Sequence, residues 1–271
     1  MNSDFTKNTE EQEHFCLMGK IVTVSSGKGG TGKTTTAAAI SSCLAALGFK
    51  TLCLDFDAGM RNLDLSLGMS EFTITDFMDV IEGRSKIEEA THECPQIKDL
   101  YFLGAPMDFY FEPPNEADVK KLFEAIRETF DYCLVDMPPG IGNLFNYTQK
   151  NADIALFVIV PQLPSIKAAH IAAQEARKLG VTELRLLINR FKQKSMLDLE
   201  TTVDEVIDAV GVQLIGVVEE DDIVALALHS ETPLILYKKL RSARNFLDAA
   251  RRLIGEDVPS KVITVKYDFD D

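Results

Sequence analysis

The residues best suited to do chemistry stand together at positions 27–34, which read Gly-Lys-Gly-Gly-Thr-Gly-Lys-Thr. They follow an apolar run at 20–25 and match G-x-x-x-x-G-K-[ST], the pattern of a phosphate-binding loop between a strand and a helix. Glycines let backbone N–H groups close around a triphosphate, and the next helix presents its positive end. The sequence therefore predicts a site for a nucleoside triphosphate with Mg²⁺.

The two lysines in this loop are expected to have different roles. Lys33 is placed to neutralise the β- and γ-phosphates, and the hydroxyl of Thr34 is placed to ligate Mg²⁺. Lys28 is a second cation where one already suffices, so its charge would be most useful against the phosphates of a neighbouring subunit. The residues expected to line the nucleotide are Lys28, Gly29, Gly30, Thr31, Gly32, Lys33, Thr34 and Thr35.

Aspartates end two further strand-like runs. One run reads Leu-Cys-Leu-Asp-Phe-Asp over 52–57, and the other reads Cys-Leu-Val-Asp-Met-Pro-Pro-Gly over 133–140. An aspartate in such a place can be only a helix N-cap or a turn residue. Beside a phosphate-binding loop, however, carboxylates at the ends of parallel strands are the expected second half of a Mg²⁺ site. The predicted metal site is Thr34, Asp57 and Asp136.

Apolar runs alternate with helical patterns along the chain. The runs are rich in Val, Ile, Leu and Phe with little alternation, which is typical of strands buried on both faces. The predicted strands are 20–25, 50–55, 99–104, 131–136, 153–160, 183–189 and 212–218, and the predicted helices are 34–47, 116–130 and 242–254. Repeated strand–helix–strand units predict an α/β fold, a single-domain P-loop NTPase with a mainly parallel twisted sheet and helices on both faces.

Composition limits the class of partner and the compartment. The net charge is −14, which disfavours nonspecific binding of DNA or anionic lipid over the whole surface. The basic stretch at 238–252 is interpreted as a solvated helix face. No two of the five cysteines form a C-x-x-C pair, so a zinc or cluster site is not indicated, and three in apolar runs suggest a reducing, cytoplasmic setting. The polar residues 1–19 and the acidic residues 260–271 are predicted to be tails of a folded domain at 20–259.

With these motifs in hand, the chain resembles the MinD/ParA family of deviant-Walker ATPases. The resemblance rests on the loop at 28–34, on Asp-Phe-Asp-Ala-Gly-Met-Arg-Asn-Leu-Asp at 55–64 and on Asp-Met-Pro-Pro-Gly at 136–140. It covers about residues 20–259, and the Arg-Asn-Leu-Asp segment is most similar to the MinD branch, which determines the septum site. The resemblance implies an ATPase with ATP and Mg²⁺ as cofactors, switching between monomer and ATP-bound homodimer.

The resemblance also implies roles for individual residues. Lys28 matches the signature lysine that crosses the dimer interface to the partner's phosphates, so Lys28, Lys33 and Asp57 form the implied catalytic set. Asp57 matches the aspartate that orients the attacking water, and Asp136 matches the one that holds Mg²⁺ through water. Asn189 and Arg190 match the position that contacts adenine. An effector protein that stimulates hydrolysis or reads the dimer is implied as well.

Three departures from the family pattern bear on partners. The end at 260–271 is acidic and alternates, whereas MinD proteins usually end in a basic amphipathic helix, so membrane binding is not expected. The stretch at 161–170 matches the family's partner-docking helix but lacks the acidic residues that many MinD proteins carry there. Glu219 stands where the family has a proline near the base, so base contacts are expected to differ.

Other functions stay open from the sequence alone. A ParA-like partitioning ATPase would use the basic stretch at 238–252 to bind DNA, and a flagellar-placement regulator of the MinD-like type has the same motifs. An iron–sulfur carrier of the nitrogenase iron-protein type would need cysteines after Asp136, and residues 141–146 contain none. The favoured function is positional control, at the division site or a similar place. The expected location is the cytoplasm, with the inner face of the membrane as the alternative.

Overall fold

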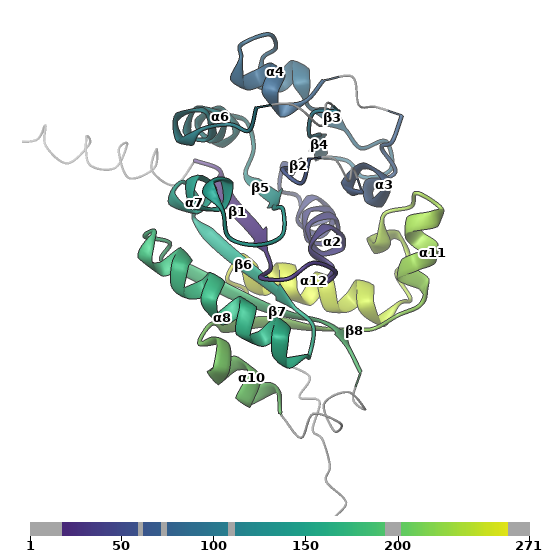
Figure 1. Ribbon diagram of the computed structural model, residues 1–271. Coiled ribbons are helices and arrows are strands. Elements are labelled where there is room, and N and C mark those ends of the chain that lie inside the picture. The colour runs from purple at the N-terminus through teal and green to yellow at the C-terminus, as the bar shows by residue number, and fades with distance from the viewer. Residues whose placement is uncertain (1–17, 59–61, 72–74, 108–111, 193–201, 260–271) are drawn as a thin grey trace, which may run out of the picture.

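Eight strands within the described residues form one twisted sheet in the order β3-β4-β2-β5-β1-β6-β7-β8 (Figure 1). The structure is a computed structural model that describes residues 18–58, 62–71, 75–107, 112–192 and 202–259. The strands are β1 (Lys20–Ser25), β2 (Thr51–Asp55), β3 (His92–Glu93), β4 (Leu100–Leu103), β5 (Tyr132–Asp136), β6 (Ile154–Ile159), β7 (Glu183–Phe191) and β8 (Gln213–Glu219).

The sheet is parallel except at one edge. All neighbouring strands pair in parallel apart from β3 and β4, which are antiparallel. The seven predicted strands are confirmed to within two residues at each end, because continuous apolar runs mark strands that are buried on both faces. Strand β3 was missed because two residues are too short to show a period.

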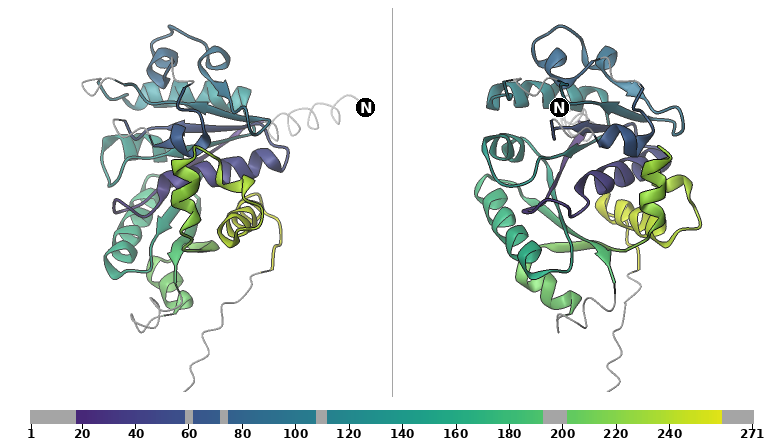
Figure 2. Two further views of the ribbon diagram at one scale, coloured as in Figure 1. Left: turned by 90° about the vertical axis from the view of Figure 1, so that its right-hand side faces the viewer. Right: turned by 45° about the vertical axis from the view of Figure 1, so that its right-hand side comes forward.

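Two helical layers cover the sheet (Figure 2). One layer encloses a core cluster with α4 (Phe77–Ile81), α5 (Ile87–Ala90), α6 (Glu116–Thr129), α7 (Asn143–Lys150), α8 (Leu163–Lys178) and α10 (Val203–Val210). The other encloses a second cluster with α2 (Lys33–Ala46), α3 (Leu63–Leu67), α11 (Ile223–His229), η1 (Leu234–Leu236) and α12 (Arg241–Leu253). The predicted α/β class with a mainly parallel sheet and helices on both faces is confirmed.

Local sequence explains the three predicted helices, which lie within one residue of the predicted bounds. Helix α6 begins at Asn115, whose side chain accepts hydrogen bonds from the backbone N–H groups of Ala117 and Asp118 in a capping box. Helix α2 is buried along most of its length because it lies between the sheet and α12, which is why its sequence is apolar or small on every side.

Strand register brings three strand ends to one edge of the sheet. Asp136 in β5 pairs with Asp55 in β2 on one side and with Val24 in β1 on the other. Because the strands are parallel, the loops that follow them leave on the same side, where ligands bind in open α/β sheets. The phosphate-binding loop leaves from β1 at this edge.

Parts of the predicted tails lie outside the described residues. These parts are 1–17 and 260–271, so the predictions about them stay predictions. Gly19, which we assigned to the first tail, instead donates a backbone hydrogen bond to the carbonyl of Arg127 over 3.0 Å. Among the described helices, none combines the length and apolarity needed to cross a membrane.

Candidate functional site

The phosphate-binding loop joins β1 to α2 with its backbone in conformations that favour glycine. Gly30 and Gly32 have φ values of 79° and 88°, in the left-handed region. The hydroxyl of Ser26 donates to the carbonyl of Lys28 over 2.6 Å, which closes the start of the loop. A Cβ on Gly27 would lie 2.3 Å from the Cβ of Ala168 on α8, so this glycine is required by close packing.

The carbonyl side of the loop is held by the end of β7. The side-chain amide of Asn189 donates to the carbonyl of Thr31 over 2.9 Å, and a Cβ on Gly32 would lie 2.2 Å from the same amide nitrogen. The guanidinium of Arg190 donates to the carbonyl of Gly30 over 3.4 Å. Carbonyls bonded on this side fix the loop, so its N–H groups can face an anion on the other.

These contacts give Asn189 and Arg190 a role that sequence reasoning missed. We had expected both residues to contact adenine, and that contact stays a prediction. Asn189 is buried, and its bond to Thr31 uses one amide hydrogen, which leaves a second hydrogen and the carbonyl oxygen. Arg190 has a φ of 52° and pairs with Glu220 over 3.3 Å. The sequence does show polar residues at the end of this strand. It does not show that they bond to the phosphate-binding loop, because that contact joins residues far apart in the chain.

The two lysines of the loop differ in exposure. Lys33 is the first residue of α2 and only 7% exposed, whereas Lys28 is exposed. Lys33 lies close enough to Asp57 and Asp136 for its charge to oppose the rise in pKa that burial causes at both carboxyls. The roles expected for the two lysines, toward the bound phosphates and toward a second molecule, stay predictions.

The predicted metal-site residues come together at the strand ends. Burial raises the pKa of Asp136 to about 7, although a hydrogen bond from Thr34 and the charge of Lys33 oppose the shift. Burial also raises the pKa of Asp57, which is half-buried, and Lys33 opposes this shift too. One lysine thus faces two carboxyl groups beside the Thr34 hydroxyl.

Asp55 is a further acidic residue of the site to which the sequence assigned no role. It is 2% exposed and faces Asp136 across the β2–β5 pair. Burial and the charge of Asp136 raise its pKa well above the ordinary value. Its carboxyl accepts the backbone N–H of Asp57 over 2.9 Å, so it fixes the backbone at Asp57.

The residues present fit a Mg²⁺ ion. Atom Oδ1 of Asp136 is buried and has no hydrogen-bond partner in the structure, so it is free to accept from a metal-bound water. No group of three or more His, Cys, Asp or Glu side chains among the described residues could hold a metal. Mg²⁺ usually takes one or two carboxylates and completes its shell with water and phosphate oxygens.

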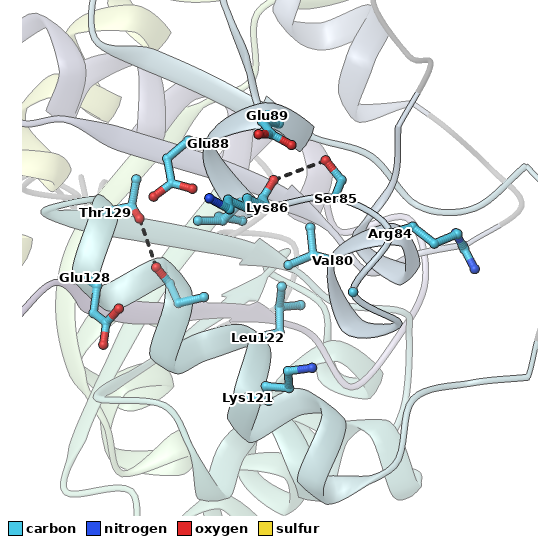
Figure 3. A pocket seen from close by; sticks show the side chains of 13 residues that line it. Val80, Arg84, Ser85, Lys86, Glu88, Glu89, Lys121, Leu122, Glu128 and Thr129 are labelled. Atoms are coloured by element: carbon cyan, nitrogen blue, oxygen red, sulfur yellow. Dashed lines mark hydrogen bonds between the residues drawn. The ribbon is translucent and has the colours of Figure 1, made fainter.

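A cavity of about 530 Å³ lies elsewhere, between α4, α5 and α6 (Figure 3). Its walls carry side chains of both signs, including Lys86, Glu88 and Glu128, and the ammonium of Lys121 is bonded to the carbonyl of Ile81 over 3.2 Å. None of the predicted site residues lines it. We therefore place the candidate site at the phosphate-binding loop.

The basic stretch at 238–252 is partly committed to the fold. The guanidinium of Arg252 donates to the carbonyls of Ile215 and Val258 over 2.9 and 3.1 Å. Arg241 pairs over 3.3 Å with Glu219, the residue that stands where the related family has a proline. The interpretation of this stretch as a helix face therefore holds for its exposed members, such as Arg244.

Similarity to known proteins shows the family of this chain. The sequence model of a family described as an AAA domain matches residues 19–200. The septum site-determining protein MinD of Bacillus subtilis is 32% identical over 251 residues, which span 91% of this chain and 93% of that protein.

Solved structures give the same result. The MinC:MinD cell division protein complex of Aquifex aeolicus matches with a TM-score of 0.81 at 31% identity, covering 89% of this chain and 98% of that chain. MinD of Pyrococcus horikoshii complexed with Mg-ADP matches with a TM-score of 0.78 at 26% identity, covering 87% and 96%. The resemblance inferred from the motifs is confirmed, and the chain belongs to the MinD family of septum site-determining ATPases within the AAA domain group.

Proposed function

We propose that this protein is a Mg-ATP-dependent switch that dimerises with ATP bound, hydrolyses it to ADP and phosphate, and takes part in placing the cell-division site. One observation carries the proposal. Lys33 is buried beside Asp57 and Asp136, whereas Lys28, on the same loop, is exposed. A single site needs one such cation, so the second is best explained by a phosphate on another copy of the chain.

The chemistry follows from these positions. Lys33 and the loop N–H groups would bind the triphosphate, Thr34 and Asp136 would hold Mg²⁺, and Asp57 would orient the attacking water. Mg²⁺, when bound, would neutralise charge on the phosphate oxygens. The γ-phosphate would order the segments after Asp57 and Asp136, and its loss would let them relax and release the partner.

An effector protein belongs to the proposal. The relative from Aquifex aeolicus was solved in a complex with MinC, and the stretch at 161–170, resembling the family's docking helix, begins α8 here. Leu163 and Ile171 on α8 are 58% and 56% exposed, so this helix offers apolar surface to a partner. We expect a partner that contacts apolar rather than acidic residues at this helix.

Three lysine variants test the proposal. Lys33→Ala should lose ATP binding, because the triphosphate loses its buried counter-charge. Lys28→Ala should bind ATP as a monomer with little turnover. Lys98→Ala, an exposed lysine far from the loop, should behave as the unmodified protein. The measurements are fluorescence titration with Mg-ATP, size-exclusion chromatography and phosphate release.

Two outcomes would contradict the proposal. Tight ATP binding by Lys33→Ala would show that this loop is not the nucleotide site. Unchanged dimerisation and hydrolysis in Lys28→Ala would show that the exposed lysine does not act across an interface.

A further inference from the structure

Strand β1 carries two polar side chains in the middle of the apolar sheet. Thr23 and Ser25 are 0% and 2% exposed, and β1 lies between β5 and β6. They alternate with Val22 and Val24, which face the other helical layer. Two hydroxyls buried directly before the phosphate-binding loop need partners, since an unpaired buried polar group is costly.

The partner is a glutamine on α7. Gln149 is 1% exposed. Its amide nitrogen donates to the hydroxyl of Ser25 over 3.3 Å and lies 3.0 Å from that of Thr23. Its carbonyl oxygen lies 3.2 Å from the same Thr23 hydroxyl. One buried amide therefore joins the helix to both hydroxyls of β1.

The position of this network relates it to the site. Helix α7 begins at Asn143, after the loop that follows Asp136. That loop is tied to β1 and the start of the phosphate-binding loop by backbone bonds from Met137 to Val24 and from Gly140 to Ser26, of 3.2 and 3.4 Å. Gln149 fastens the far end of the same segment, so the loop runs between two attachments to one strand.

We propose that Gln149 is a positioning residue for ATP hydrolysis. It sets the placement of α7 on β1 and thereby the placement of the segment carrying Asp136 relative to the phosphates. A buried amide paired with two hydroxyls favours one arrangement. Sliding or turning the helix would leave the amide and the Ser25 hydroxyl unpaired, and it would leave the Thr23 hydroxyl with only its longer bond, of 3.4 Å, to the carbonyl of Ile154. An apolar side chain would tolerate several arrangements. The inference rests on the proposed function and extends it to a residue outside the loop motifs.

The test separates positioning from stability. Gln149→Leu leaves the hydroxyls of Thr23 and Ser25 without their amide partner and should lower the melting temperature. Adding Thr23→Val and Ser25→Ala replaces the network by apolar groups and should recover that temperature. In both proteins we expect kcat to fall at least about fivefold with KM for ATP within about twofold, the pattern of an interaction that acts on the transition state.

A matched control is Thr51→Val. Thr51 is 0% exposed and donates to the carbonyl of Phe49 over 2.9 Å, at the opposite end of the sheet from the loop. The Thr51→Val substitution removes a buried hydroxyl from an interior strand of the sheet. This variant should therefore have a lower melting temperature and an unchanged kcat.

Hydrogen exchange gives a second readout that does not depend on turnover. With Mg-ATP bound, amides at 137–147 should exchange faster in the triple variant than in the unmodified protein, while those of β7 stay the same. Recovery of kcat together with the melting temperature, or unchanged exchange at 137–147, would overturn the proposal. Absence of turnover in the unmodified protein would instead refute the proposed function, and the exchange comparison would still decide this inference.

Discussion

The side-chain amide of Asn189 donates a hydrogen bond to the backbone carbonyl of Thr31 across 2.9 Å, which joins the end of β7 to the middle of the phosphate-binding loop. The two residues are 158 positions apart in sequence. The bond occupies a carbonyl of the loop and leaves its N–H groups for phosphates. Asn189 therefore shapes the loop before any ligand arrives, whatever base the nucleotide carries.

Asn189→Ala should weaken binding of ATP and of inorganic triphosphate alike. The loss of one hydrogen bond to the loop is expected to cost about 1 kcal/mol, or roughly a fivefold change in affinity. Titration of both ligands with Mg²⁺ measures it. Asn151→Ala is the matched control, because Asn151 makes the same kind of amide-to-carbonyl bond, to Tyr147, away from the loop. A loss confined to ATP would show that Asn189 acts only through the base.

The loop contact illustrates what sequence could and could not predict at the site. Lys33, Asp57 and Asp136 were found because each belongs to a local pattern with a known chemical purpose. The bond from Asn189 to the loop, and the facing of Asp55 and Asp136, depend on strand order. Local patterns carry no information about strand order, so these relationships appeared only in the structure.

The same distinction applies to the fold. Buried strands can be recognised by their continuous apolar runs, and long amphipathic helices such as α6 by a helical period that spans several turns. Helices α3, α4 and α5 have five or fewer residues, which is too short for a period to emerge. Their positions are set by packing against α6, α2 and α11, so they were not predicted.

Gly27→Ala should destabilise the folded protein, and Gly29→Ala should not. A Cβ on Gly27 would meet the Cβ, carbonyl carbon and oxygen of Ala168 at 2.3–2.5 Å, whereas a Cβ on Gly29 meets no atom within 4 Å. Overpacking of this kind typically costs about 1–3 kcal/mol. Thermal denaturation without nucleotide compares the two variants. Equal melting temperatures would mean that α8 yields to the added methyl group.

Stability without nucleotide should fall as the pH rises towards neutrality. Burial raises the pKa of Asp136 to about 7. Between about pH 4 and pH 7 the folded protein therefore keeps a proton on this carboxyl that the unfolded chain has already released. The free energy of unfolding therefore decreases across that window. Melting temperatures measured at several pH values should show the decline, and Asp136→Asn should reduce its slope, leaving the contributions of Asp55 and Asp57, whose pKa values burial also raises. An unchanged slope in Asp136→Asn would contradict the assignment of this proton.

Asp57→Ala should keep ATP binding and lose hydrolysis. The carboxyl of Asp57 is half-buried near Lys33, and its proposed task is to orient the attacking water rather than to hold the nucleotide. Loss of such a group typically lowers kcat by about 10²-fold or more. Because ATP then persists, the dimer should persist in size-exclusion chromatography with Mg-ATP. Asp208→Ala, an exposed residue of α10, is the control and should dissociate as ATP is consumed. If the Asp57→Ala protein binds ATP but stays a monomer, the expectation that bound ATP is enough to hold the dimer would be wrong. Unimpaired phosphate release would show that Asp57 is not a catalytic residue.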